Sequence, residues 1–291
     1  MRVLATIGFS FSAGVFLAAL LPWNGWQLYA AGGVLLLALA WLFAARKQKY
    51  FRRGLLILLP LAVSLAYFAG YDHLVRQPIE NRCGAASDFT ATVCDWPQAT
   101  ERGARVTVEL EGYHRARAVL YGEAELLAAR PGDTVTGTAQ WQSAVHFNSD
   151  DVTHFNARGV YALLYGREDV RLSAGDGDAL RWLPQRAGKA FREKVVAIWD
   201  DARVSGFLTA ELTGDKSAMD DGDYLAMQET GLAHLFAVSG LHCAFLVTLL
   251  ALLISRRQRL LCAVTIPLLL FYMVMVGMSP SVVRACIMQI F

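Results

Sequence analysis

The stretch TGLAHLFAVSGLH, Thr230–His242, places two histidines, one serine and two glycines at the head of an apolar run that continues to Ile254. Polar groups inside a segment of membrane length are costly to bury, and they usually face a bundle interior or a water-filled path. We therefore expect His234, Ser239 and His242 to act within a membrane.

The composition of the whole chain supports a membrane protein. Of its 291 residues, 55% are hydrophobic and only 18% are charged, which is rare in a soluble domain. No charged residue occurs between Val3 and Ala45. This region predicts two membrane helices, Val3–Leu21 and Gln27–Ala44, and a third apolar run follows at Gly54–Gly70. The alternative for the first run is a cleaved signal peptide.

The basic residues predict how the chain crosses the membrane. Lys and Arg cluster at positions 46–53 and again at 256–259, and loops of this kind stay in the cytoplasm. The N-terminus then lies inside and residues 71–229 lie outside. A fourth span ends near Ile254, a fifth covers Leu260–Val276, and a further helix starts near Ser281. Because no polar anchor follows that helix, we expect the chain to be a piece of a longer polytopic protein.

The segment after Tyr71 predicts a small β domain. Its strand-like runs are separated by turn signals such as Pro131-Gly132-Asp133. A five-stranded OB-like barrel fits the length, and so does another small β fold. The predicted fold class is therefore α+β, a polytopic helical bundle with an inserted extracytoplasmic OB-like barrel. The expected strands are Asp88–Val93, Ala104–Leu110, Arg115–Tyr121 and Thr134–Trp141.

Two cysteines fall in the β domain. An oxidising compartment favours a disulfide between Cys83 and Cys94, and the alternative is two buried thiols. Cys243, Cys262 and Cys286 lie in apolar runs and are expected to be small hydrophobic residues.

The β domain is acidic, and a basic helix follows it. Residues 73–172 hold ten Arg, no Lys and thirteen Asp plus Glu, so the domain as a whole lacks the basic footprint typical of nucleic-acid binding. Leu183–Ala202 predicts a basic amphipathic helix that either lies in the membrane interface or packs on the barrel or bundle. Asp221 is the expected N-cap of the next helix.

Four short motifs resemble the ComEC family of competence proteins. They are Gly214–Ser217, Thr230–Leu235, Val238–His242 and Gly277–Ala285, and the order of membrane helices, β domain and polytopic region agrees as well. The resemblance implies an OB-fold and a channel that carries single-stranded DNA across the bacterial inner membrane during natural transformation. It also implies the partners: single-stranded DNA, the lipid bilayer, other DNA-uptake proteins and further copies of the chain.

We expect four regions in this chain. Residues 1–70 form three transmembrane helices, 71–175 the extracytoplasmic OB-like domain, 176–229 amphipathic connector helices, and 230–291 the truncated start of the competence-type membrane region. Seven residues are expected to line the channel or contact DNA, with helix-to-helix hydrogen bonding as the alternative role. They are His234, Ser239, Gly240, His242, Ser279, Ser281 and Arg284.

No catalytic residue, cofactor or metal site is predicted. Ser239 lies in a motif that superficially resembles intramembrane serine proteases, but a nucleophile needs a base within reach. His242 is poorly placed on the same helix, and no histidine follows it. His234 and His242 lack the further ligands that a metal site needs. The competing non-enzymatic interpretation is a membrane-anchored extracytoplasmic nucleic-acid-binding module.

Overall fold

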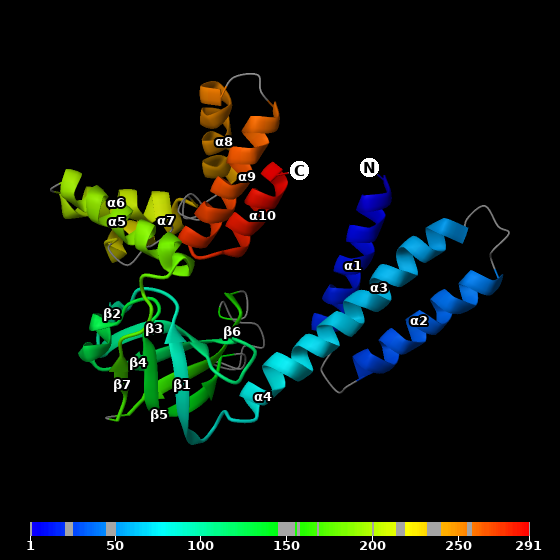
Figure 1. The fold of residues 1–291 in the computed structure, drawn as a ribbon, viewed down its shortest axis with the longest axis horizontal. Coiled ribbons are helices and arrows are strands. Elements are labelled where there is room, and N and C mark those ends of the chain that lie inside the picture. Colours follow the sequence, from blue (N-terminus) through cyan, green and yellow to red (C-terminus); the bar gives the residue numbers. More distant parts are fainter. Residues whose placement is uncertain are drawn as a thin grey trace. The chain divides into compact units, whose positions relative to one another are not determined.

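The chain folds into two compact units, residues 1–81 and 82–291, and Figure 1 shows their elements. This computed structural model describes residues 2–20, 26–44, 51–144, 155, 158–167, 169–199, 201–213, 219–231, 240–254 and 258–290.

The first unit is a three-helix cluster in which the third helix contacts both others. Small residues let the first and third helices approach closely: a Cβ atom built on Gly14 would lie 1.9 Å from Ser64 Oγ. Ala18, Ala31 and Leu65 form the buried core. The three predicted N-terminal helices are therefore confirmed as α1 (Arg2–Leu20), α2 (Trp26–Ala44) and α3 (Phe51–Tyr71).

The third helix runs further than its sequence predicted. It continues through one wide turn at Asp72–Arg76 into α4 (Gln77–Glu80), where Arg76 pairs with acidic side chains one turn away on either side. Gly54–Glu80 is thus long and apolar enough to cross a membrane, and the described part of the chain holds no second helix that meets this length. Five shorter apolar helices coincide with the other predicted spans, so the multi-pass bundle stays a prediction.

The second unit begins with a closed β-barrel. The strands follow the order β1-β3-β4-β6-β5, and pairing between β1 and β5 closes the ring. Neighbouring strands are antiparallel except β4 and β6, which are parallel. The α+β class is confirmed, and the barrel agrees with the OB-like domain expected here. Its strands are β1 (Ala86–Val93), β2 (Gln98–Thr100), β3 (Gly103–Leu110), β4 (Arg117–Gly122), β5 (Thr134–Ser143), β6 (Val160–Gly166) and β7 (Arg171–Ser173).

The Pro-Gly-Asp turn fastens the barrel to the segment that leaves it. Asp133, 8% exposed, accepts hydrogen bonds from the Arg130 N–H (2.8 Å) and the Gly175 N–H (3.1 Å). Gly132 has a φ of 102°, and a Cβ there would lie 2.8 Å from Trp182 Nε1. The turn therefore requires glycine for both its conformation and its close contact.

Two expectations for the barrel are corrected, and one strand is additional. Strand β4 starts at Arg117 because His114 and Arg115 adopt positive φ in the preceding turn. Strand β6 was not predicted. The Cys83–Cys94 disulfide is not formed: the two residues lie beyond opposite ends of the eight-residue β1, roughly 25 Å apart at strand rise, whereas a disulfide needs Cα atoms within about 7 Å.

After the barrel, the described part of the second unit is mostly helical and begins with a single-turn helix η4 (Leu180–Trp182). The predicted amphipathic helix stops at Ile198 because Trp199 turns to an extended conformation. The α-helices that follow η4 are α5 (Leu183–Ile198), α6 (Ala202–Thr213), α7 (Asp221–Glu229), α8 (Gly240–Ile254), α9 (Gln258–Met275) and α10 (Pro280–Ile290).

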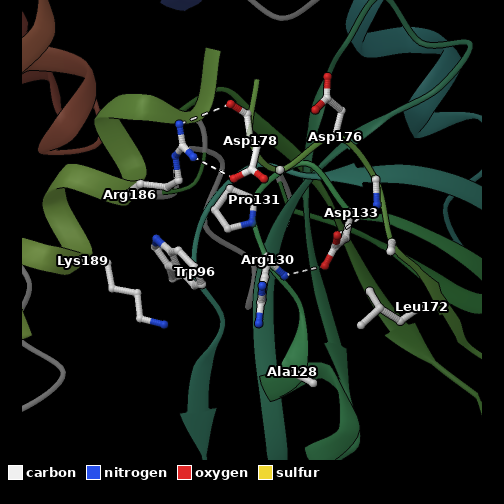
Figure 2. A pocket seen from close by; sticks show the side chains of 13 residues that line it. Trp96, Ala128, Arg130, Pro131, Asp133, Leu172, Asp176, Asp178, Arg186 and Lys189 are labelled. Atoms are coloured by element: carbon white, nitrogen blue, oxygen red, sulfur yellow. Dashed lines mark hydrogen bonds and ion pairs between the residues drawn. The ribbon is translucent and has the colours of Figure 1, made fainter. Parts of the chain in front are cut away.

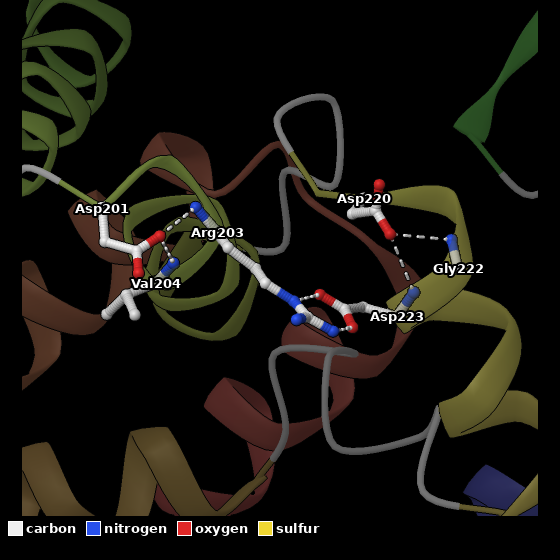
Figure 3. Close-up of polar contacts among 6 residues, drawn as sticks. All are labelled: Asp201, Arg203, Val204, Asp220, Gly222 and Asp223. Atoms are coloured by element: carbon white, nitrogen blue, oxygen red, sulfur yellow. Dashed lines mark hydrogen bonds and ion pairs between the residues drawn. The ribbon is translucent and has the colours of Figure 1, made fainter.

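Acidic side chains fix the ends of α6 and α7 and tie the two helices together (Figure 3). Asp201 caps α6 by accepting from the N–H groups of residues 203 and 204. Asp220, one residue before the predicted Asp221, caps α7 by accepting from the N–H groups of residues 222 and 223. Arg203 donates two hydrogen bonds to Asp223, which lower the pKa of that carboxyl.

Candidate functional site

The first polar motif, Thr230–His242, lies only partly within the described residues. His234 and Ser239 lie outside the described residues, whereas Gly240 is the first residue of α8. Gly231 ends α7 in the left-handed conformation, with a φ of 73°. The described part of this motif therefore places Gly240 and His242 in the first turn of α8.

His242 has a polar partner that the sequence did not reveal. Its Nε2 lies 3.5 Å from Glu211 Oε1 of α6, and the two side chains are 19% and 29% exposed. The Tyr272 hydroxyl of α9 donates to the Leu212 carbonyl nearby in sequence (3.4 Å). The C-terminal end of α6 is thereby attached to both α8 and α9.

The second polar motif, Gly277–Ala285, forms the turn between α9 and α10 and the start of α10. Gly277 has a φ of 86°, and the N–H groups of Gly277 and Met278 donate back to Val274 O and Met273 O. These two bonds are those of a glycine-terminated helix end. Pro280 then occupies the first position of α10, where its missing N–H costs nothing. Gly277 and Pro280 thus serve the fold.

The polar residues of the second motif divide into two groups. Ser279 and Ser281 meet at the start of α10, with their hydroxyl oxygens 3.3 Å apart. Arg284 is exposed, whereas its neighbours Ala285 and Cys286 are buried against α8 and α9. The structure therefore brings the two serines together and leaves Arg284 on the outer face of α10.

The helices α8 and α10, whose first turns belong to the two motifs, pack against each other. Cys243 of α8 and Cys286 of α10 are fully buried with their sulfur atoms 3.6 Å apart, and Leu269 of α9 and Val282 join this core. These two cysteines are core residues, in agreement with the small hydrophobic role expected of them, whereas Cys262 is exposed. Figure 1 shows that α8 and α10 run in the same direction, opposite to α9. His242, Ser279 and Ser281 consequently lie toward the same end of the helical cluster.

This shared end has a distinct electrostatic character. Helix N-termini carry partial positive charge and unpaired N–H groups, and two of them, from α8 and α10, lie there together. Imidazole and hydroxyl groups add hydrogen-bonding capacity there. In the described residues, no three His, Cys, Asp or Glu side chains gather as metal ligands would.

The barrel surface contributes a second cluster. Cross-strand register places Arg105, Tyr121, Tyr165 and Gln140 in one row over β3, β4, β6 and β5. The two tyrosine rings stack with centroids 5.2 Å apart and planes 13° apart, and Tyr165 is 38% exposed. Partial burial, and then the neighbouring Tyr121, raise the pKa of the Tyr165 hydroxyl. The predicted strand Arg115–Tyr121 included Tyr121. The pairing of Tyr121 with Tyr165 depends on β6, which was not predicted.

In this chain a small β-barrel thus precedes packed apolar helices, two of which begin with the polar motifs. Residues 212–291 match the family model described as Competence protein, which includes every described motif residue from Gly240 onward. This segment is of the ComEC type, and the resemblance drawn from the motifs is confirmed.

One curated protein supports the same assignment. ComE operon protein 3 of Bacillus subtilis (strain 168) is 36% identical to this chain over 88 residues, which cover 29% of the chain and 11% of that protein. The matched stretch thus spans about a tenth of its relative. No solved structure matches the chain.

Proposed function

We propose that this chain forms part of an inner-membrane channel that carries single-stranded DNA into a bacterial cell during natural transformation. The observation that carries the proposal is the packing of α8 on α10, two parallel helices whose first turns belong to competence-type motifs. Polar groups gather at that end, while the outer faces of the same helices are apolar.

The exposed side chains support a bilayer around these helices. Phe245, Leu252 and Leu253 of α8 are 68%, 77% and 74% exposed, and Phe9 of α1 is 80% exposed. Apolar surface of this extent marks a membrane or a protein interface. With the basic loops inside, we propose a multi-pass topology with a cytoplasmic N-terminus and an extracytoplasmic barrel.

The chemistry of the shared end suits transport of a polyanion. A conducting path needs contacts strong enough to admit its cargo and weak enough to release it. Serine hydroxyls, an imidazole and helix N-termini make such contacts with phosphate or bases. We assign this role to Gly240, His242, Ser279 and Ser281, and to His234 and Ser239 from their place in the motif. Arg284 is assigned a phosphate contact at the outer face of α10.

Transformation frequency tests the channel. We expect Ser239→Ala and His242→Ala, introduced into the full-length gene, to reduce DNA uptake at normal membrane abundance, and we expect the same of Arg284→Ala. Thr248→Ala is the matched control, because its exposed hydroxyl donates to Ala244 O of its own helix (2.8 Å). Normal uptake in all three variants would contradict the assignment.

A second candidate function is a membrane-anchored extracytoplasmic nucleic-acid-binding module. The stacked pair Tyr121–Tyr165 beside Arg105 favours it, because exposed aromatic rings and a nearby cation bind single strands by stacking and charge. Replacing one stacking residue costs about 1–3 kcal/mol, or roughly 5- to 150-fold in affinity. Tyr165→Ala should lose that much oligonucleotide affinity and Tyr165→Phe should retain it; equal affinities would exclude the platform.

We further propose that the chain acts without catalysis, in company with other DNA-uptake proteins and further copies of itself. A fluorophosphonate probe tests the first point. Covalent labelling of the wild-type chain that disappears in Ser239→Ala would show a nucleophilic serine and contradict the non-catalytic role.

A further inference from the structure

A cleft separates the barrel from α5. It consists of two adjoining cavities of about 530 and 940 Å³, and Figure 2 shows the smaller one. The barrel side comes from the β1–β2 loop and the turn before β5. Four residues line both cavities and mark where they meet: Trp96, Ala128, Arg130 and Lys189.

A lysine is held in position at this junction. Lys189 Nζ lies 3.9 Å from the centroid of the Trp96 ring, a cation–π contact. The ring is itself fixed, because Trp96 Nε1 donates a hydrogen bond to the Gln185 carbonyl (3.0 Å). Arg192, one turn further along α5, lines the larger cavity. The cleft therefore presents ordered cations along one helix face.

Five carboxylates also line the cleft: Asp95, Asp133, Asp176, Asp178 and Glu193. None of them lines both cavities, so the charged side chains at the junction itself are the two cations Arg130 and Lys189. Both oxygens of Asp133 accept from backbone N–H groups, and Asp178 pairs with Arg186 at 2.8 Å. Glu193 lies 3.8 Å from Lys189. The Arg130 guanidinium is exposed and has no side-chain partner among the described residues. A ligand that approaches the junction therefore meets an available guanidinium beside an ordered ammonium (Figure 2).

The larger cavity also reaches α6. Thr209 lines it and is only 4% exposed, yet its hydroxyl has no hydrogen-bond partner in the described structure. A buried hydroxyl without a partner is costly, and a ligand oxygen would satisfy it. Glu211, the partner of His242, lies two residues further along the same helix. One helix thus links the cleft to the end where α8 and α10 begin.

We propose that this cleft binds the sugar–phosphate backbone of single-stranded nucleic acid, with Arg130, Lys189 and Arg192 on its phosphates. The inference rests on the proposed function, and it adds a path for the nucleic-acid strand between the barrel and α8. Phosphodiesters fit the site because several cations are spaced along a groove rather than gathered around one point. Trp96 serves as a positioning residue that orients Lys189.

The salt dependence of binding tests this proposal. The full chain in a neutral detergent is titrated with a fluorescent oligothymidylate of about 16 nucleotides, the upper site size of one OB-fold. Each lost phosphate contact lowers the magnitude of the slope of log K against log salt by about 0.7. We expect that decrease in Arg130→Gln and in Lys189→Gln, and about twice that in the double variant. Arg102→Gln, an exposed change outside both cavities, should leave the slope unchanged.

The outcomes distinguish a failure of the cleft proposal from a failure of the proposed function on which it rests. Equal slopes in Arg130→Gln, Lys189→Gln and Arg102→Gln, with wild-type binding intact, would overturn the cleft and leave the channel standing. No binding by the wild-type chain would count against DNA contact altogether. The last experiment measures binding to vesicles of neutral lipid, with and without anionic phosphatidylglycerol. If Arg130→Gln and Lys189→Gln weakened only vesicle binding, the cleft would be a lipid site and the proposal would be wrong.

Discussion

Replacing Asp133 should loosen the wall of the cleft by a predictable amount. Its carboxylate accepts two hydrogen bonds, from Arg130 N–H at 2.8 Å and from Gly175 N–H at 3.1 Å. Bonds to a charged group contribute about 1.5–3 kcal/mol each. Arg130 and Gly175 are both exposed, so water replaces the lost acceptor and the lower value applies. Asp133→Ala should therefore cost about 3 kcal/mol of local stability.

Hydrogen exchange of the full chain measures this cost directly. Local opening that becomes about 3 kcal/mol easier accelerates amide exchange roughly 150-fold at residues 130, 132, 133 and 175. Asp133→Asn keeps one acceptor oxygen, so we expect about half the energy and roughly 10-fold acceleration. Asp176→Ala is the control, since this exposed carboxylate forms no side-chain hydrogen bond in the described structure. Wild-type exchange in Asp133→Ala, or equal acceleration in Asp176→Ala, would refute the reasoning.

Three further predictions concern a thiol and two glycines. Burial, and then Glu109, raise the pKa of Cys94 to about 12, so the folded thiol should resist alkylation at pH 8. Because the unfolded thiol ionises first, stability should fall as pH rises from about 9 toward 12, and Cys94→Ala should remove that fall. Gly277→Ala imposes a left-handed φ on alanine in otherwise open space, which should cost about 1–2 kcal/mol in thermal unfolding. Gly14→Ala should separate α1 from α3, because the added Cβ clashes with Ser64. A disulfide between cysteines introduced into the two helices should then no longer form. Gly8→Ala is the control, because this helical position has open space around it. It should neither lower thermal stability nor prevent the cross-link.

The helices were the most predictable part of the fold. Long apolar runs without charge specify helices wherever they lie, because backbone hydrogen bonding is satisfied within the segment. The predicted runs therefore coincide with α1, α2, α3, α8, α9 and α10. Helix ends were less certain, because they depend on local capping geometry: Asp220 rather than Asp221 caps α7.

The β domain was predicted in part. Alternation and the Pro-Gly-Asp turn located β1, β3 and β5 within two residues. Strand β6 has a largely apolar sequence at Val160–Gly166 that does not alternate cleanly, so periodicity could not identify it. The disulfide failed for a geometric reason, since sequence spacing does not show that β1 separates the two cysteines.

The sequence by itself determined that the chain contains apolar helices, a small β domain and two competence-type motifs, because these follow from local periodicity and from short residue patterns. Only the tertiary structure decided which distant residues meet. Cys243 packs on Cys286, Glu211 reaches His242, Tyr121 stacks on Tyr165, and Lys189 lies over Trp96. Each contact joins residues from separate elements, and their proximity depends on strand register and helix packing, which no local pattern encodes.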